Sequence, residues 1–337
     1  MFSELSITSN FSFLQGASHP EEYMERGAFL GLNAIAIADV NSVAGIVRAH
    51  TYGEKIKQTV LERQRIESFG PPCPRHLKGY SLIDVENVPR LIPAARLIFE
   101  EGVSVTSIIR THEGWKTICK LISKGRLRSK KGECELKIAD VSKKISGITL
   151  LLHVPQTLPK KNDTWWKEVR HLLSTQKDCS YLVMSPYYDG LDETRFDRLY
   201  RLSKSFSLPV VASAFPLMHH GKRRRLADVL NAIKQGKKIE QLGKSALVNA
   251  EQRLRSPQEI NKLFSKFPIA IKNANKISAN CSLPLNATYS PFALTISGII
   301  SDDLATIVNG PGQNLSATVW VSELHIANVC ICSIEKQ

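Results

Sequence analysis

Few of the side chains that could bind a metal or carry out acid–base chemistry stand close together in this sequence. His219 and His220 are adjacent, and Cys330 and Cys332 are separated by one residue, with His325 as the nearest further candidate. Structural zinc needs four ligands in paired spacings, so this C-x-C motif is weak evidence for a metal. Adjacent residues on an extended chain point to opposite sides, and we therefore expect His219 and His220 to be a surface pair.

Other polar residues stand at the ends of apolar runs. His153 and Asp39 each follow such a run. A histidine there either faces an opening as a metal ligand or is hydrogen-bonded within the fold, and we favour the second interpretation. Asp39 is expected to cap the following helix together with Asn41, or to brace a loop. Ser6 and Thr8 have no histidine and acid partners at meaningful spacing, so no nucleophilic site is predicted.

The charge balance favours a polyanionic partner. Lys and Arg number 45 against 31 Asp and Glu, which gives a net charge of +14. Basic proteins gain affinity for nucleic acid by releasing counterions from phosphates. The alternative is a solvated basic surface without a partner.

Two clusters of basic residues are the candidate contacts for nucleic acid or a partner protein. They are Arg126, Arg128, Lys130 and Lys131, and Lys222, Arg223, Arg224 and Arg225. Cations are unfavourable at a helix N-terminus, where the second cluster falls, so that cluster lacks a local stabilising role. Aromatic residues are not interleaved with the clusters, and reading of base sequence is not supported.

Composition places the chain among folded proteins of the cytoplasm. It has 337 residues, of which 43% are hydrophobic and 23% charged, values close to the average for folded soluble proteins. The seven cysteines are odd in number and scattered, which suits reduced thiols. No secretory signal and no apolar run long enough for a membrane span is evident, so we expect a cytoplasmic protein with no membrane contact.

The predicted elements alternate between strands and helices. Leu5–Ile7 alternates as a strand, Ser18-His19-Pro20-Glu21 begins a helix that ends near Phe29, and Ala34–Ala38 is a strand buried on both faces. The same order returns later: strands over 147–152, 181–184 and 209–212, and helices over 165–173 and 193–206. This repetition predicts an α/β fold with a parallel sheet.

The rest of the chain is less regular. Helices are predicted over 224–236, from Ser256-Pro257-Gln258-Glu259 onward, and over 270–279. The segment over 58–90 is long and aperiodic, with prolines at 71, 72 and 74. We predict that it is a surface insertion. The predicted domains are a barrel over 1–255, a small helical extension over 256–291 and a divergent tail over 292–337.

One long motif and several shorter ones carry a family resemblance. The long motif is ELSITSNFSFLQGASHPEE (4–22); the others are Ala36–His50, Arg90–Leu97, Lys131–Cys134, Leu226–Leu230, Ala250–Arg253, Ser256–Glu259 and Cys281–Leu283. Their sequence and order resemble the N-terminal region of bacterial error-prone DNA polymerases of the C family, which are related to the polymerase III alpha subunit. The resemblance implies a PHP domain, a distorted seven-stranded (β/α) barrel whose active members bind two or three metal ions.

The ligands of that metal site are replaced in this chain. Where active members have His-x-His, this chain has Ser6-Ile7-Thr8, and a further ligand position falls near Gln15. The Asp-His pair corresponds to Asp39-Val40, a glutamate to Arg96, and the late Asp-x-His to Phe215-Pro216-Leu217. Valine, phenylalanine and leucine cannot ligate a metal, and a guanidinium repels one. We therefore predict no catalytic residues, no metal site and no cofactor for this chain.

For a full-length polymerase the resemblance implies DNA-templated synthesis in damage tolerance. It implies Mg²⁺ in a palm domain, and DNA, a sliding clamp and damage-response proteins as partners. No palm segment is recognised here, and a truncated or frameshifted gene is the economical explanation. Three functions stay open: a catalytically silent PHP-like docking module, a stand-alone metal-dependent phosphoesterase, and a basic nucleic-acid-binding protein.

Overall fold

The computed structural model describes residues 1–68, 77–80, 83–141, 145–160 and 163–283. Tertiary contacts divide the chain into the units Met1–Leu283 and Pro284–Gln337. The predicted tail over 292–337, with Cys330, Cys332 and His325, lies outside the described residues. Within the described part, no helix is both long and apolar enough to cross a membrane.

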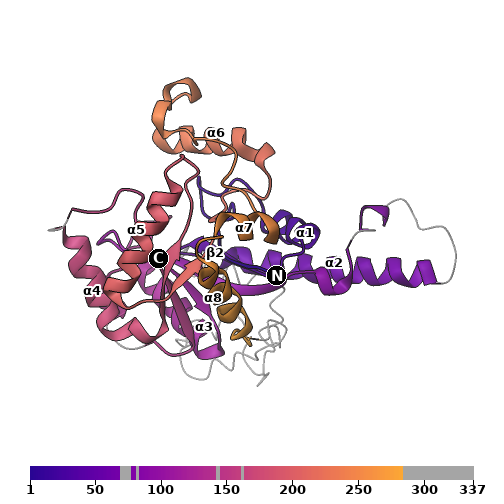
Figure 1. Ribbon diagram of the computed structural model, residues 1–337, viewed down its shortest axis with the longest axis horizontal. Coiled ribbons are helices and arrows are strands. Elements are labelled where there is room, and N and C mark those ends of the chain that lie inside the picture. The colour runs from indigo at the N-terminus through magenta and orange to yellow at the C-terminus, as the bar shows by residue number, and fades with distance from the viewer. Residues whose placement is uncertain (69–76, 81–82, 142–144, 161–162, 284–337) are drawn as a thin grey trace, which may run out of the picture. The chain divides into compact units, whose positions relative to one another are not determined.

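The described strands form one seven-stranded sheet in which each strand pairs with the next along the chain. They are β1 (Ser3–Ile7), β2 (Ala34–Val40), β3 (Arg90–Ile98), β4 (Ser104–Ile109), β5 (Ile148–His153), β6 (Ser180–Met184) and β7 (Val210–Ala212). The sheet curls into a nearly closed barrel covered by helices (Figure 1). The predicted seven-stranded α/β barrel is thus confirmed.

One strand departs from the predicted parallel order. Strand β4 runs antiparallel to both β3 and β5, whereas the other neighbouring pairs are parallel. The cause is the short connection from β3 to β4, closed by a hydrogen bond from Phe99 N to Val103 O of 2.9 Å and a left-handed Gly102 at φ 78°. A parallel crossover needs a dozen or more residues, so a turn of this length forces the chain to reverse.

Eight described α-helices surround the sheet. They are α1 (Pro20–Leu30), α2 (Ala44–Ser68), α3 (His112–Leu127), α4 (Thr164–Gln176), α5 (Asp192–Phe206), α6 (Arg224–Gln235), α7 (Pro257–Leu263) and α8 (Pro268–Ala279). The predicted capping box of α7 is confirmed, because the Ser256 hydroxyl accepts from Glu259 N. The capping box of α1 lies one residue later than predicted. His19 is the N-cap, and its backbone N–H donates to the Glu22 carboxylate at 2.9 Å.

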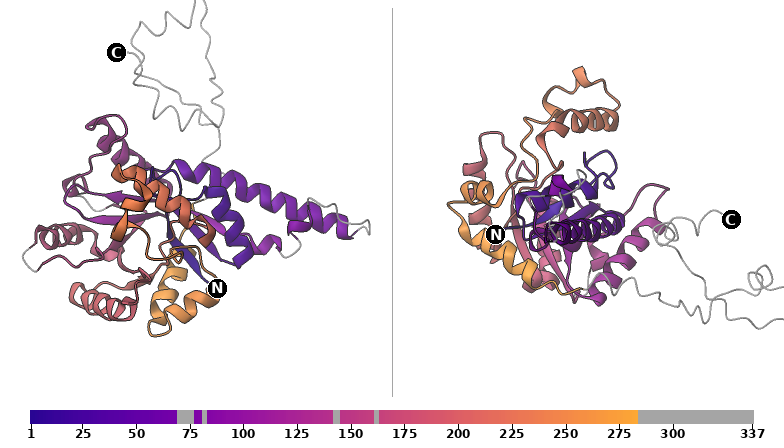
Figure 2. Two further views of the ribbon diagram at one scale, coloured as in Figure 1. Left: turned by 90° about the horizontal axis from the view of Figure 1, so that it is seen from above. Right: turned by 90° about the vertical axis from the view of Figure 1, so that its right-hand side faces the viewer.

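Helix α2 passes through the start of the segment predicted as an insertion. It continues to Ser68 and extends beyond the sheet (Figures 1 and 2). Its Arg63 side chain is buried and donates from Nη1 to Tyr80 O at 3.0 Å. Leu77 and Ile83 are also buried. The described part of 58–90 therefore packs against the rest of the fold at these points.

The seam between the first and last strands is closed by loops and a helix rather than by a strand ladder. Thr8 N donates to Pro216 O at 3.2 Å, and Ala17 N donates to Leu217 O at 2.8 Å. Helix α8, part of the predicted helical extension, packs against both β7 and β1. These contacts hold the carboxyl ends of β1 and β7 next to each other.

We expect Gly114→Ala to destabilise the fold, although alanine normally favours a helix. A Cβ at Gly114 in α3 would lie 2.3 Å from Gly147 O, a backbone atom that cannot move freely. Overpacking of this kind costs about 1–3 kcal/mol, which exceeds the gain of about 0.5–1 kcal/mol that alanine brings to a helix. Urea unfolding should therefore show a lower unfolding free energy.

The matched control is Gly79→Ala, because a Cβ there meets no atom within 4 Å. It should change the unfolding free energy little. Equal stability of the Gly114→Ala variant and the parent chain would contradict the close approach of α3 to the turn before β5.

Candidate functional site

The positions that the family resemblance assigns to metal ligands gather at the carboxyl ends of the strands, which we call the barrel mouth. Ser6 lies in β1, Asp39 in β2 and Arg96 in β3, while Phe215 follows β7. Gln15 lies half-buried in the turn after β1, where its N–H donates to Ser12 O at 3.0 Å. The positions named by the family resemblance thus lie together at the barrel mouth. The chemistry of the mouth depends on what these side chains contact.

A chain of hydroxyl groups crosses the mouth from β1 to β5. The Ser6 hydroxyl donates to Thr106 Oγ1 at 3.3 Å, and Thr106 Oγ1 lies 2.8 Å from His153 Nε2. All three side chains are buried. A neutral imidazole can accept the Thr106 proton, so the chain of hydrogen bonds is complete without a metal. The predicted structural role of His153 is confirmed.

A cation and an aromatic ring fill the next part of the mouth. The Arg96 guanidinium lies 4.6 Å from the centre of the Phe215 ring, and its Nε donates to Ser104 Oγ at 3.0 Å. The Phe215 ring also contacts the His153 ring at a centroid distance of 5.1 Å. Burial lowers the pKa of Arg96 to about 10, so its side chain remains charged at neutral pH.

This charge acts directly on His153. Burial lowers the pKa of His153 well below its ordinary value, and the positive charge of Arg96 lowers it further. The imidazole is therefore neutral at pH 7. An arginine cation at the position of a ligand carboxylate also repels a divalent metal ion, since like charges in a partly buried site interact strongly.

Asp39, the one carboxylate retained from the ligand motif, points its oxygens at the loop after β1. It accepts hydrogen bonds from Ser9 N at 2.9 Å, Ser9 Oγ at 2.8 Å and Ser12 Oγ at 2.7 Å. Burial raises its pKa against the opposing effect of these hydrogen bonds. Of the two roles predicted for Asp39, bracing a loop is the one observed.

Glu4 is a site residue that sequence reasoning missed. Its carboxylate accepts from Ser6 N at 3.2 Å, from the Ser213 hydroxyl and from Ala214 N at 2.8 Å, so it joins β1 to the segment after β7. Burial raises its pKa to about 6, although the hydrogen bonds from Ser213 and Ala214 oppose that shift. The only signal in the sequence was an acidic residue inside a strand that is otherwise free of charge.

The adjacent histidines take part in separate contacts. The His219 ring is within hydrogen-bond distance of Ser18 Oγ, at 2.8 Å, and 3.6 Å from the Glu22 carboxylate. The His220 ring accepts from Lys222 N at 3.1 Å and caps a short turn. Burial lowers the pKa of both rings. Among the described residues, no group of three or more His, Cys, Asp or Glu side chains could hold a metal ion.

The first basic cluster begins in the last turn of α3. Arg126 donates from Nη2 to Asn41 O at 3.1 Å, and Arg128 makes a two-point contact with the Asp140 carboxylate at 2.9 and 3.0 Å. Lys130 and Lys131 are exposed. Two of the four cations thus stabilise the fold locally, and contact of the cluster with nucleic acid stays a prediction.

The second cluster has a local stabilising role, contrary to the prediction from the sequence. Arg223 pairs with Glu22 of α1, and Arg224 donates to Leu247 O at 2.8 Å. These contacts tie the start of α6 to segments that are remote in sequence, which compensates for the unfavourable position of cations at a helix N-terminus. Lys222 and Arg225 are exposed and stay candidate contacts for a partner.

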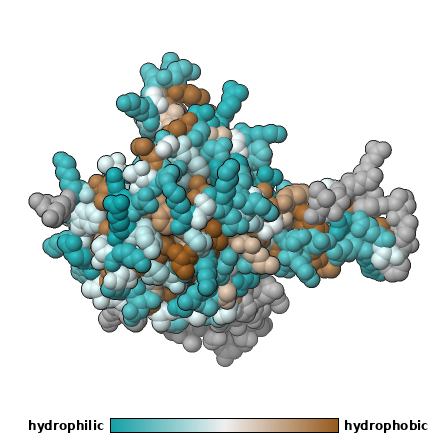
Figure 3. All heavy atoms as spheres, in the orientation of Figure 1, coloured by the Kyte–Doolittle hydropathy of each residue, from teal (hydrophilic) through white to brown (hydrophobic). Residues whose placement is uncertain are grey.

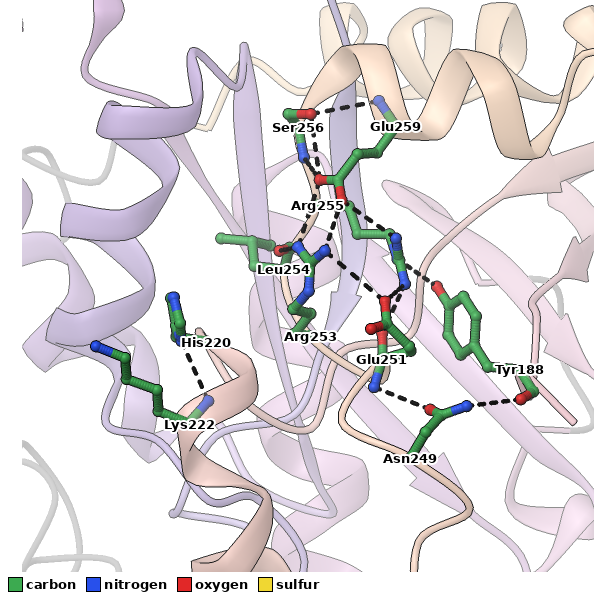
Figure 4. Close-up of polar contacts among 10 residues, drawn as sticks. All are labelled: Tyr188, His220, Lys222, Asn249, Glu251, Arg253, Leu254, Arg255, Ser256 and Glu259. Carbon is green, nitrogen blue, oxygen red and sulfur yellow. Dashed lines mark hydrogen bonds and ion pairs between the residues drawn. The ribbon is translucent and has the colours of Figure 1, made fainter.

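A network of charges near Lys222 fixes the chain between α6 and α7 (Figure 4). Arg253 donates to Glu259 at 2.6 Å, and Arg255 Nε donates to the Tyr188 hydroxyl at 2.8 Å. Asn249 donates to Tyr188 O at 2.8 Å. Since Tyr188 follows β6, these bonds attach the segment to the rim of the barrel.

Comparisons with known proteins confirm the predicted resemblance. The chain is 34% identical over 297 residues to the error-prone DNA polymerase of Ruegeria pomeroyi, covering 85% of this chain and 26% of that protein. It is 32% identical over 286 residues to the error-prone DNA polymerase of Rhodopseudomonas palustris strain BisB5, covering 85% and 23%. The chain thus spans about a quarter of the length of these curated relatives. No family model matches.

Solved structures show weaker likeness. A Bifidobacterium adolescentis protein assigned as a metal-dependent phosphoesterase has a TM-score of 0.39 at 12% identity, covering 63% of this chain and 86% of that one. An amidohydrolase from Chromobacterium violaceum has a TM-score of 0.39 at 10% identity, covering 64% and 87%. The fold class rests on the sheet topology described above.

We expect stability to fall with decreasing pH through His153. In the unfolded chain this histidine takes up a proton near pH 6.5, whereas in the fold its pKa lies well below that value. The unfolded state therefore binds more protons as the pH falls, and from pH 7 to pH 5.5 the unfolding free energy should drop by about 1 kcal/mol through this residue.

Urea unfolding of the parent chain and of His153→Gln at both pH values would measure this effect. Glu4 acts in the opposite sense, because its pKa is raised to about 6 and its protonation favours the fold; its contribution cancels in the comparison. His171→Gln, a change of an exposed histidine in α4, should keep the pH dependence of the parent chain. Identical pH dependence in His153→Gln and the parent chain would contradict the role assigned to His153.

Proposed function

Because the chain is homologous to about a quarter of the length of error-prone DNA polymerases, we propose that it is a PHP-like module of such an enzyme without chemistry of its own. Its role is structural: it is a folded platform to which the polymerase part docks. DNA-templated synthesis in damage tolerance, with Mg²⁺, a sliding clamp and damage-response proteins, belongs to the assembled polymerase.

The proposed absence of chemistry rests on one observation: side chains of the protein itself fill the barrel mouth. Arg96, Phe215 and Ser6 stand at positions that the family resemblance assigns to metal ligands, and Ser6 is hydrogen-bonded through Thr106 to His153. Hydrolysis of phosphoesters by such barrels depends on clustered metals that activate water and neutralise the phosphate. A half-buried arginine and a neutral histidine that is hydrogen-bonded through Nε2 supply neither function. The stand-alone phosphoesterase is therefore the less favoured alternative.

We expect the purified chain to hydrolyse neither p-nitrophenyl phosphate nor the 3′ end of single-stranded DNA when Mn²⁺ or Zn²⁺ is added. Metal analysis after dialysis should find no stoichiometric Zn²⁺ or Mn²⁺. The control is Asp39→Ala, which removes the one retained ligand carboxylate and should leave the background unchanged. Activity above background that this substitution abolishes, together with stoichiometric metal, would disprove the proposal.

The docking role is supported by an apolar surface on α6. The apolar face of this helix is only partly covered: Leu226 is 38% and Ile233 59% exposed, and both Ile239 and Val248 nearby are exposed. Hydrophobic residues are visible over α6, which stands away from the sheet (Figure 3). Phe13, in the loop after β1, is 81% exposed and lines a pocket of about 270 Å³ together with Leu226 and Leu230.

The occupant that we assign to this surface is the polymerase part of an error-prone DNA polymerase. An amphipathic helix face of this kind is normally buried. About three quarters of each relative's length has no counterpart in this chain, which leaves ample protein to cover it. The α6 face therefore fits a contact between the platform and that remaining part.

Binding to a purified polymerase segment tests the docking role. The segment is the part of the Ruegeria pomeroyi relative that this chain does not match. Ile233→Lys should weaken binding at least tenfold in a titration, because a charge would replace a buried apolar contact. Leu61→Lys makes the same change at a residue of α2 that is 53% exposed and should bind like the parent chain. Failure of the parent chain to bind, or equal weakening by both substitutions, would reject this docking surface.

A further inference from the structure

The exposed side of α3 carries two parallel rows of side chains with different chemistry. The cationic row consists of Lys116, Lys120, Lys124 and Arg128, and the second row consists of Trp115, Cys119, Ser123 and Leu127. Together these eight residues, all from α3 and its C-cap, line a shallow, open depression of about 710 Å³, which we call the α3 groove. None of its residues is one of the barrel-mouth residues described above, and it shares only Arg128 with the basic clusters.

The groove lies in a strongly basic part of the chain. Residues 112–131 contain seven Lys and Arg residues and one acidic residue, Glu113. Among the described residues, no acidic side chain forms an ion pair with Lys116 or Lys120. Asp140 lies at the far end, where it contacts Lys124 at 2.7 Å and Arg128 at 2.9 Å. Two cations of the row are thus positioned by the fold and two are open to an outside anion.

The second row adds a surface for a flat apolar group. Trp115 is half-buried, so its ring is held by the fold yet remains accessible, and Leu127 at the other end is 76% exposed. Sequence reasoning found no aromatic residue within the basic clusters. Helix α3 nevertheless places an aromatic residue near the first cluster. Trp115 lies beside Lys116 and a few turns before Arg126 and Arg128.

The spacing of the cations fits an extended polyanion. Residues four positions apart on a helix rise by about 6 Å, so the four cations form a row about 18 Å long. Phosphates in a duplex strand are about 3.4 Å apart along the axis, and a strand released from the duplex can extend beyond this. We propose that the α3 groove binds single-stranded nucleic acid, with phosphates along the cationic row and a base stacked on Trp115.

An acidic amphipathic helix is the competing occupant, and the groove suits it less well. Helix-in-groove recognition needs a continuous apolar seat for anchors at helical spacing. Here the second row is interrupted by the hydroxyl of Ser123, and the cations lie along one side only. Stacking on an aromatic residue beside a track of cations is the general means of binding single strands without sequence preference.

This inference is independent of the proposed docking role, and it is tested with the full chain. Binding of a fluorescein-labelled oligothymidylate is measured by anisotropy over a range of salt concentrations. Lys116→Gln/Lys120→Gln should weaken binding and reduce the magnitude of the slope of log K against log salt by about 1.4, since each phosphate contact contributes about 0.7. Trp115→Leu should lower the affinity roughly fivefold or more and leave the salt slope unchanged.

Matched controls separate the groove from charge in general. Lys167→Gln/Arg170→Gln removes two exposed cations from α4 and should bind like the parent chain, and Trp115→Leu should not affect binding of a duplex of the same length. Thermal unfolding verifies that each variant is folded. Equal losses in the α3 and α4 variants, or unchanged single-strand affinity in Trp115→Leu, would overturn the proposal. If the α3 variants bound the oligonucleotide with unchanged affinity and an acidic helical peptide displaced it, the groove would be assigned to a protein partner instead.

Discussion

The barrel depends on a buried carboxyl group at its seam. Strands β1 and β7 do not share a ladder of hydrogen bonds, and Glu4 bridges the gap by accepting bonds from Ser6, Ser213 and Ala214. Unpaired strand edges expose polar groups that must find partners. Glu4, the second residue of β1, supplies such a partner to the segment after β7, and the hydrogen bonds from Thr8 N to Pro216 O and from Ala17 N to Leu217 O bring the loops that follow β1 and β7 together. The geometry of the barrel mouth follows from that meeting.

The barrel mouth is held together by contacts among its own side chains. In a metal-binding barrel, ligands from several strands are held together by the ion. Here hydrogen bonds from Ser6 through Thr106 to His153, and the stacking of Arg96 on Phe215, join the same strands. Burial of one cation is tolerable because the neighbouring histidine stays neutral and the aromatic face attracts the guanidinium. These contacts connect β1, β4 and β5, and a hydrogen bond from Arg96 to Ser104 connects β3 to the residues of β4 at this end.

The basic side chains of this protein fall into two groups, those that make contacts within the fold and those that are open to an outside anion. Arg223, Arg224 and Arg128 make contacts within the protein that tie helices to distant segments. Lys116 and Lys120 form no ion pair with a described acid and face an open groove. Composition gives the same weight to every cation, whereas only the second kind contributes to attraction of an outside polyanion. Net charge therefore favours a polyanionic partner by its sign, but it gives no location for the contact.

The sequence by itself determined the α/β alternation, most helix positions and the family, because these depend on local periodicity, capping residues and ordered motifs. It also predicted the position of the barrel mouth and the replacement of its ligand residues. Only the tertiary structure decided that β4 runs antiparallel, that Glu4 closes the seam and that Asp39 braces a loop. These features arise from residues far apart in the chain or from the length of one turn. Hydrogen bonding and burial between such residues are set by the packed fold, on which local sequence patterns carry little information.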